Sequence, residues 1–294
     1  LGIIGIWPAE KVDLCYERAL GALDLRSVHG SLLLATEFNS FRPVRIDSDQ
    51  IGGAALLAYC NQFKETLLMS VSAVTTRRDV ERQVVVGSLQ LPGNLGVPRA
   101  ATTLVIFAHG SGSSRFSPRN MAVAEALNAQ GMGTLLFDLL TPDEEQDRAN
   151  VFDIPLLAER LVEVVRWIDR QPELTRLQLG LFGASTGAAA ALVAAAELGS
   201  RVGAVVSRGG RPDLAGAALK MVTAPTLLIV GGFDGAVIEL NEQAFAQLTG
   251  KKSLEIIPGA SHLFPEPGAM EAVIVLAARW FSTHLSARRR STSG

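Results

Sequence analysis

The fold of this chain is decided by the stretch Leu177-Gln178-Leu179-Gly180-Leu181-Phe182-Gly183-Ala184-Ser185-Thr186-Gly187. Its apolar first half predicts a buried strand, and the alanine-rich segment 188–198 that follows predicts a helix. A Gly-x-Ser-x-Gly turn between a strand and a helix is typical of a nucleophile elbow, because small neighbours permit the tight turn that exposes the serine hydroxyl. The helix that follows aims its first N–H groups at an oxygen on which charge develops. We therefore predict that Ser185 is a nucleophile.

Two further polar residues follow buried strands downstream, first an acid and then a histidine. Asp234 comes after the strand 226–230, and His262 comes after the strand 254–257. The carboxyl ends of parallel strands gather functional groups at one edge of a sheet, and the order Ser, acid, His fits the elbow. We predict that His262 takes the proton of Ser185 and returns it to the leaving group. Asp234 would orient the imidazole and stabilise its charged form.

A fourth element lies upstream, where the predicted strand 103–108 breaks into His109-Gly110-Ser111. A His-Gly turn at this place commonly supplies one backbone donor of an oxyanion hole, and the residue after the nucleophile supplies the other. We assign the second donor to Thr186 and the first to Gly110 or Ser111, without choosing between them. His109 would then brace the loop.

Each assignment has an alternative. Ser185 could be a small residue tolerated in a tight turn, and Asp234 could cap the helix that follows it. Asp138, also at a strand end, competes with Asp234 for the acid role. The residues that compete with His262 as the base are His29, His109 and His284.

From about residue 81 to residue 285 the chain resembles a serine α/β-hydrolase of the dienelactone hydrolase-like family. It is similar in particular to hydrolase domains fused behind phosphoribosyltransferase domains. The resemblance is carried by residues 107–115, 181–187 and 258–262. It implies an α/β-hydrolase fold with neither a metal nor an organic cofactor. Dienelactone hydrolases proper use a cysteine nucleophile, so Ser185 shifts the expectation from a dienelactone to an ordinary carboxylic ester.

Strands and helices alternate regularly after residue 83, which predicts a mostly parallel sheet covered on both faces, with an antiparallel first strand. The predicted strands are 84–91, 103–108, 134–137, 177–182, 202–207, 226–230 and 254–257. The predicted helices are 118–130, 154–170, 186–198, 237–248 and 267–285, and 142–150 is predicted to be a charged loop.

The segment 208–224 is too short to hold more than a loop and one short helix, so we predict no large cap domain. The site should therefore be open and suited to esters of short to medium acyl chain. Arg208 and Arg211 border the expected pocket and are candidates to bind a substrate carboxylate. An ion pair of these arginines with Asp213 or with the acidic loop is the alternative.

We divide the chain into an N-terminal region of unknown role (1–80), the hydrolase domain (81–287) and a disordered tail (288–294). The N-terminal region holds candidate helices at 9–23 and 51–69 and a candidate strand at 31–35. Its Cys15 and Cys60 lack metal-ligand spacing and are expected to be free thiols, with a disulfide as the minor alternative.

Composition bounds the partners. The chain of 294 residues is 48% hydrophobic and 19% charged, as expected of a soluble α/β domain. Its net charge of −2 gives no reason to expect a nucleic-acid partner. No apolar run reaches the ~18–20 residues of a membrane helix, and the first residues lack the basic flank of a signal peptide. We expect a cytoplasmic protein whose partner is a small-molecule ester, and the oligomeric state stays open.

The favoured function is a serine esterase that forms an acyl-enzyme on Ser185. Thioesterase, lactonase, amidase and perhydrolase activities share the triad and stay open within the enzyme class. The alternative from another class is a non-catalytic binding protein that holds a ligand in the same pocket. Such proteins usually lose a member of the triad, and this sequence retains all three.

Overall fold

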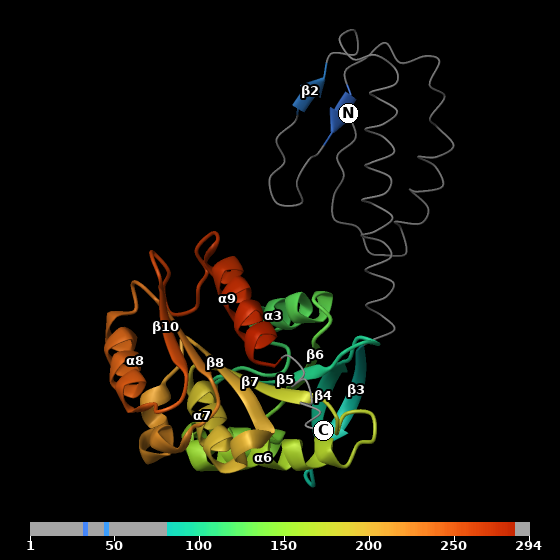
Figure 1. Ribbon diagram of the computed structural model, residues 1–294, viewed down its shortest axis with the longest axis vertical. Coiled ribbons are helices and arrows are strands. Elements are labelled where there is room, and N and C mark those ends of the chain that lie inside the picture. Colours follow the sequence, from blue (N-terminus) through green and yellow to red (C-terminus); the bar gives the residue numbers. More distant parts are fainter. Residues whose placement is uncertain (1–31, 35–43, 47–80, 286–294) are drawn as a thin grey trace, which may run out of the picture. The chain divides into compact units, whose positions relative to one another are not determined.

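The computed structural model describes residues 32–34, 44–46 and 81–285 (Figure 1). The chain divides into two units, Leu1–Val71 and Ser72–Gly294. In the first unit, β1 (Leu32–Leu34) and β2 (Val44–Ile46) pair antiparallel, and β1 falls within the strand predicted at 31–35. The predicted helices 9–23 and 51–69, the two cysteines, and the tail lie outside the described residues, and the boundary at residue 80 stays a prediction.

The second unit is built on one sheet whose eight strands run in the order β10-β9-β8-β7-β5-β6-β4-β3 (Figure 1). The six strands from β10 to β6 are parallel to one another, and β4 and β3 add an antiparallel edge. The strands are β3 (Glu81–Val86), β4 (Leu91–Gly96), β5 (Thr103–Ala108), β6 (Gly133–Phe137), β7 (Gln178–Ala184), β8 (Val202–Arg208), β9 (Thr226–Gly231) and β10 (Lys252–Ile257).

Helices cover both faces of this sheet, as predicted. Helices α3 and α9 pack together on one face, and α6, α7 and α8 lie on the other (Figure 1). The helices are α3 (Pro118–Ala129), α4 (Pro142–Gln146), α5 (Arg148–Phe152), α6 (Ile154–Asp169), α7 (Thr186–Leu198), α8 (Gly235–Gln247) and α9 (Ala269–His284), with the 3-10 segments η2 (Gly199–Arg201) and η3 (Pro212–Met221).

The core follows from the apolar patterning of the central strands. Strands β5 and β9 are buried at every position, as expected of parallel strands that are covered on both faces. Helix α7 has nine buried residues, most of them alanines, whose small side chains let it lie deep in the α6–α7–α8 layer. The first helical residue after the nucleophile candidate is therefore anchored in the most buried helix of this face.

Two local predictions are wrong. The predicted strand 84–91 is in fact a hairpin, because residues 87–90 form a turn with positive φ at Gly87 (71°) and Gln90 (53°) between β3 and β4. The predicted loop 142–150 contains α4, which begins with a capping box between Thr141 and Glu144. It also contains the start of α5, whose N-cap is the Asp147 side chain. The Gly-Ser pair at 87–88 and the spacing of Thr141 and Glu144 were the signals for these features.

The strand order reverses around β5, which is where an open α/β sheet forms its binding crevice. The chain goes from β5 to β6 on one side and then returns to β7 on the other. Ala108 at the end of β5 lies opposite Gly183 near the end of β7, and Ala184 lies opposite Arg208 at the end of β8. The loops that follow these strands therefore meet at one edge of the sheet.

Candidate active site

Ser185 occupies a strained turn between β7 and α7. Its backbone has φ 50° and ψ −122°, one of three positive φ values at non-glycine positions in the described part of the chain. Such a conformation costs of order 1–3 kcal/mol and persists only where the surroundings hold it in place. The surroundings here are close: a Cβ built on Gly187 would collide with the carbonyl oxygens of Ala108 and His109, and one built on Gly110 would lie 2.9 Å from the Ser185 Cβ. The turn at Ser185 is therefore packed closely against the loop after β5.

Asp234 and His262 are brought together by adjacent parallel strands. The His262 Nδ1 lies 2.6 Å from the Asp234 Oδ2, in a bond that spans 28 residues of sequence. A second link joins the two loops, where the Phe233 backbone N–H donates to the Ala260 carbonyl at 2.9 Å. Asp234 is at the N-cap position of α8, but its side chain makes no capping bond. The carboxylate therefore holds the imidazole and does not cap the helix.

Asp138, the competing acid, has a different partner. Its Oδ1 accepts a hydrogen bond from the Arg115 backbone N–H at 2.7 Å, and its Oδ2 pairs with the Arg115 guanidinium. Both carboxylate oxygens thus fix the loop after β5 to the end of β6. Of the two predicted acids, the structure brings Asp234 to His262.

The loop after β5 carries the candidate oxyanion donors. The Ser111 backbone N–H donates to the Thr186 Oγ1 at 3.0 Å, so this donor points at the residue next to the nucleophile. Thr186 is the first residue of α7, where a backbone N–H has no partner within the helix. The structure thus places both predicted regions of the hole side by side. Sequence reasoning missed the Thr186 hydroxyl, and a hydroxyl residue directly after the elbow serine was the available signal.

His109 braces this loop, as predicted. The Leu139 backbone N–H donates to the His109 Nε2 at 3.1 Å, so Nε2 is unprotonated and Nδ1 carries the proton. Nδ1 then donates to the Gly110 carbonyl at 3.0 Å. Burial lowers the pKa of His109, while the bond to Gly110, then Asp138 and Glu145, oppose this shift. His109 is therefore neutral, and its two hydrogen bonds link the loop after β5 to the end of β6.

The other predicted histidines lie elsewhere. His284 is at the end of α9, where its ring packs edge-on against Trp280 with the ring centres 4.4 Å apart. Burial, followed by the charge of Lys251, lowers the pKa of His284. His29 is outside the described residues.

The two predicted substrate-binding arginines have different surroundings. Arg211 forms a double hydrogen bond with Asp213, at 2.9 Å from Nε and 2.8 Å from Nη2, so the predicted alternative of an ion pair describes it. Arg208 is only 5% exposed, and its Nη2 donates to the Asn120 Oδ1 at 3.3 Å. Sequence reasoning did not identify Asn120, which no motif distinguishes.

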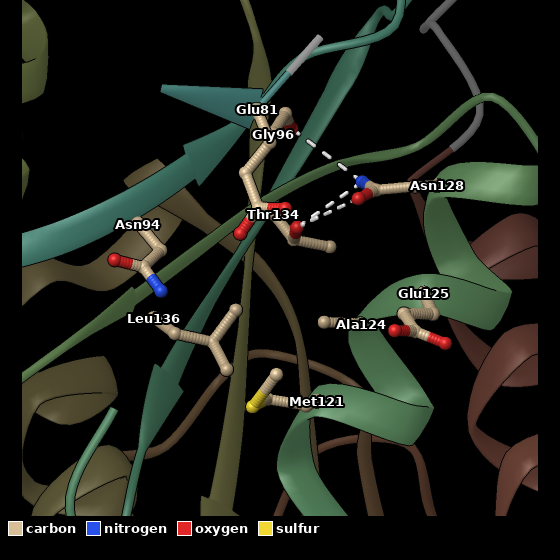
Figure 2. Close-up of a pocket in the computed structure, with 9 residues that line it drawn as sticks. All are labelled: Glu81, Asn94, Gly96, Met121, Ala124, Glu125, Asn128, Thr134 and Leu136. Atoms are coloured by element: carbon tan, nitrogen blue, oxygen red, sulfur yellow. Dashed lines mark hydrogen bonds between the residues drawn. The ribbon is translucent and has the colours of Figure 1, made fainter. Parts of the chain in front are cut away.

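A pocket apart from these residues lies between α3 and the strands β4 and β6 (Figure 2). Two of its polar side chains are bonded to each other and to the backbone: the Asn128 Nδ2 donates to the Thr134 Oγ1 at 3.1 Å and to the Met132 carbonyl at 2.8 Å. None of the proposed catalytic residues lines it. We interpret it as part of the packing contact between α3 and the sheet.

Metal ligation and membrane insertion find no support in the part of the chain that the structure describes. No group of three or more His, Cys, Asp or Glu side chains there could hold a metal ion. No described helix is both long and apolar enough to span a bilayer.

Comparison with known proteins agrees with this geometry. Residues 101–272 match the family described as an alpha/beta hydrolase domain. A Mycobacterium tuberculosis protein named putative phosphoribosyl transferase is 57% identical over 223 residues, which cover 76% of this chain and 50% of that protein. The chain thus spans about half the length of the curated relatives it matches.

Solved structures include a dienelactone hydrolase from Anabaena variabilis, which is 57% identical with a TM-score of 0.67. The match covers 70% of this chain and 97% of that one. Est1E from Butyrivibrio proteoclasticus shares the fold at 18% identity and a TM-score of 0.58, covering 70% of this chain and 98% of that one. With an eight-stranded sheet, a serine at the elbow and a family match over more than half its length, the chain belongs to the α/β-hydrolase family, in the dienelactone hydrolase-like group.

Proposed function

We propose that the chain is a serine hydrolase that cleaves carboxylic esters of short to medium acyl chain. The observation that carries this proposal is the 2.6 Å bond between His262 Nδ1 and Asp234 Oδ2, at the same edge of the sheet as the strained Ser185. A carboxylate on Nδ1 leaves Nε2 as the basic nitrogen, which is what a general base for a serine requires. The Asp234 side chain is 17% exposed and the His262 side chain is 38% exposed, so the acid is the more buried of the two.

The reaction would proceed in two balanced steps. The Ser185 Oγ attacks the ester carbonyl carbon while its proton passes to the His262 Nε2, and the resulting oxyanion is held by backbone N–H groups. The C–O bond to the alcohol then breaks as His262 returns the proton to the leaving oxygen. Water attacks the acyl-enzyme by the same route, with His262 first taking and then returning a proton, and the acid is released.

The oxyanion donors would be the Thr186 backbone N–H and one N–H of the Gly110–Ser111 turn. Thr186 is favoured because the first N–H groups of a helix point outward and carry the positive end of the helix dipole. A Cβ built on Gly110 would lie 2.9 Å from the Ser185 Cβ, and the Ser111 N–H donates to the Thr186 Oγ1, so the turn that holds both residues lies beside the elbow.

The test is labelling with a fluorophosphonate probe followed by peptide mass spectrometry. The probe reports an activated serine without a known substrate, and we expect the label on the peptide that contains Ser185. The Ser185→Ala variant should lose both the label and p-nitrophenyl butyrate hydrolysis, by up to ~10⁶-fold in kcat for a removed triad nucleophile. A label on another serine, or wild-type turnover in Ser185→Ala, would remove Ser185 from the role.

A further inference from the structure

Helix α8 buries one amide side chain completely. Asn241 lies in the second turn of α8 and has no exposed surface. Its Nδ2 donates to the Val237 carbonyl at 2.8 Å, one turn earlier in the same helix, and to the Gly210 carbonyl at 3.0 Å, in the loop after β8. Both amide protons are therefore used, and one of them joins α8 to a loop that is 31 residues away in the sequence.

An amide at this position is costly if its only role is to fill space. The Asn241 Oδ1 is buried and receives no hydrogen bond in the part of the chain that the structure describes. A buried acceptor without a donor lowers stability, and an apolar side chain of similar shape would avoid this cost. The other buried residue of α8, Ala244, is apolar. The benefit of Asn241 therefore comes from the two bonds that its Nδ2 donates.

The loop that accepts one of these bonds touches both the proposed nucleophile and the proposed base. This 209–211 loop follows β8 directly, and its Arg211 N–H donates to the Ser185 carbonyl at 3.1 Å. Gly209, with φ 50°, lies against His262. A Cβ built on Gly209 would be 2.9 Å from the His262 carbonyl oxygen and 3.7 Å from Cε1, the ring carbon bonded to Nε2. The 209–211 loop is thus in contact with the two residues that must exchange a proton.

The middle residue of the 209–211 loop is closely packed. A Cβ built on Gly210 would lie 2.6 Å from the Ala188 Cβ, so the loop backbone rests on α7, the helix that begins after Ser185. Asn241 holds the carbonyl of this same residue. Because α8 begins directly after Asp234, its N-cap residue, the bond ties the helix that follows the proposed acid to the loop that contacts the serine and the histidine.

We propose that Asn241 is a positioning residue, which sets the place of Ser185 relative to His262 through the Gly210 carbonyl. The inference rests on the proposed function, and Asn241 itself touches neither the substrate nor the reacting atoms. Transfer of the Ser185 proton to the His262 Nε2 requires hydrogen-bond contact, so a small shift of the 209–211 loop would slow it. The bond between His262 and Asp234 does not pass through this loop, so the basicity of the imidazole should not change.

Two substitutions remove the bond in different ways. Asn241→Leu has a similar volume and removes both donated bonds. Asn241→Ser has a single hydroxyl proton, which can bond the carbonyl one turn earlier, as Ser282 does with the Ala278 carbonyl at 2.7 Å, and so loses only the bond to Gly210. Both variants should lower kcat for p-nitrophenyl butyrate by about 10- to 100-fold with little change in KM, as for a misplaced reacting group. If Asn241→Leu does not fold, Asn241→Ser carries the test.

The rate is expressed per active site, titrated to completion with the fluorophosphonate probe, so a loss of folded protein cancels. A purely structural role would leave fewer sites, each with the wild-type kcat. A positioning role leaves slower sites and an unchanged midpoint in the pH dependence of kcat. Ala244→Gly is the matched control, because it weakens the same helix at a buried position and keeps the Asn241 side chain. It should keep the wild-type kcat per site.

Two outcomes would overturn this inference and leave the esterase standing. One is a wild-type kcat per site in the Asn241 variants. The other is a loss of kcat with a shifted pH midpoint, because Asn241 would then act on the pair of His262 and Asp234 and not on the place of Ser185.

Amide hydrogen exchange tests the same link without a substrate. The Arg211 N–H donates to the Ser185 carbonyl, so its exchange reports the placement of the 209–211 loop. We expect this amide to exchange about tenfold faster, or more, in Asn241→Ser than in the wild type and in Ala244→Gly. If no ester is hydrolysed and no serine is labelled, the esterase proposal fails. Faster exchange would still support the link from Asn241 to Ser185, and equal exchange would overturn it.

Discussion

The Ser111 backbone N–H donates a hydrogen bond to the Thr186 hydroxyl at 3.0 Å, across 75 residues of sequence. The bond joins the loop after β5 to the first residue of α7, which are the two regions that hold the proposed oxyanion donors. Because the hydroxyl accepts this bond, its own proton is free to donate elsewhere. Thr186 thus connects the two halves of the proposed hole through a side chain as well as through its backbone.

Thr186→Val should reduce kcat, because valine keeps the shape of threonine and removes the hydroxyl that holds the Ser111 loop. We expect a loss of about 2- to 12-fold with little change in KM, as for one neutral hydrogen bond. Thr186→Ser, which keeps the hydroxyl, should be close to wild type. Steady-state kinetics with p-nitrophenyl butyrate measures this. A loss above about 100-fold would show that the hydroxyl itself donates to the oxyanion, and no loss would make the bond incidental.

Asp234→Asn should lower kcat by about 10⁴-fold, the loss seen where an amide leaves a catalytic histidine in the wrong tautomer. The reason is the 2.6 Å bond between the His262 Nδ1 and the Asp234 Oδ2. An asparagine can place its NH2 group where this oxygen lies, and the NH2 group would then donate to an Nδ1 that carries no proton. Asp138→Asn is the paired control, because Asp138 is bonded to Arg115. It should cost far less activity. Equal losses, or a greater loss at Asp138, would transfer the acid role.

The free energy of unfolding should decrease as the pH falls, over a pH range that His109 partly sets. Burial lowers the pKa of this histidine in the folded state, so the unfolded chain binds its proton more readily. Neutral His109 makes its whole contribution to the free energy of unfolding at pH values above about 6.5, the pKa of a histidine in the unfolded chain. This contribution is lost as the pH falls towards the lower pKa of the folded state, at up to ~1.4 kcal/mol per pH unit.

This prediction is checked by urea unfolding at pH 7.5 and pH 5.5. We expect the wild type to lose more stability between these values than His109→Gln, whose amide oxygen can still accept from the Leu139 N–H but does not titrate. Equal losses in the two proteins would show that His109 does not contribute to the acid sensitivity.

Activity should be greatest for short esters. The segment after β8 forms only η3, which packs on α7 and α8 and provides no cap. Apolar side chains near the proposed triad are exposed, with Phe233 at 76% and Leu263 at 47%. Each further buried methylene would add about 0.8 kcal/mol in a long groove, so an open site should gain over a few carbons and then level off, with kcat/KM highest at about C2 to C6.

A p-nitrophenyl ester series, kept below the critical micelle concentration, measures this preference. Phe233→Ala should reduce kcat/KM for the hexanoate more than for the acetate, since only the longer chain can reach an apolar rim. A steady rise to C12 would contradict the open site.

The site was predictable wherever a local pattern carries the chemistry. Glycines beside Ser185 permit the turn, and an apolar run followed by a polar loop marks the end of a strand at Asp234 and at His262. Backbone sterics and side-chain periodicity act over a few residues, so one sequence is enough to see them. The hairpin at 87–90 was missed although its turn is also a local signal. Apolar residues stand on both sides of the turn, and together they predicted one continuous strand.

By itself, the sequence determined the alternation of strands and helices, the strained position of the serine, and the order of the three proposed catalytic residues. Only the tertiary structure decided that Asp234 holds His262 while Asp138 holds Arg115, and that Arg211 has an acidic partner while Arg208 does not. The bond from Arg208 to Asn120 spans 88 residues, and such a contact depends on how strands and helices pack. The physical reason is that a side chain's partner is set by the register of the sheet and the placement of its helices, which no short window of sequence contains.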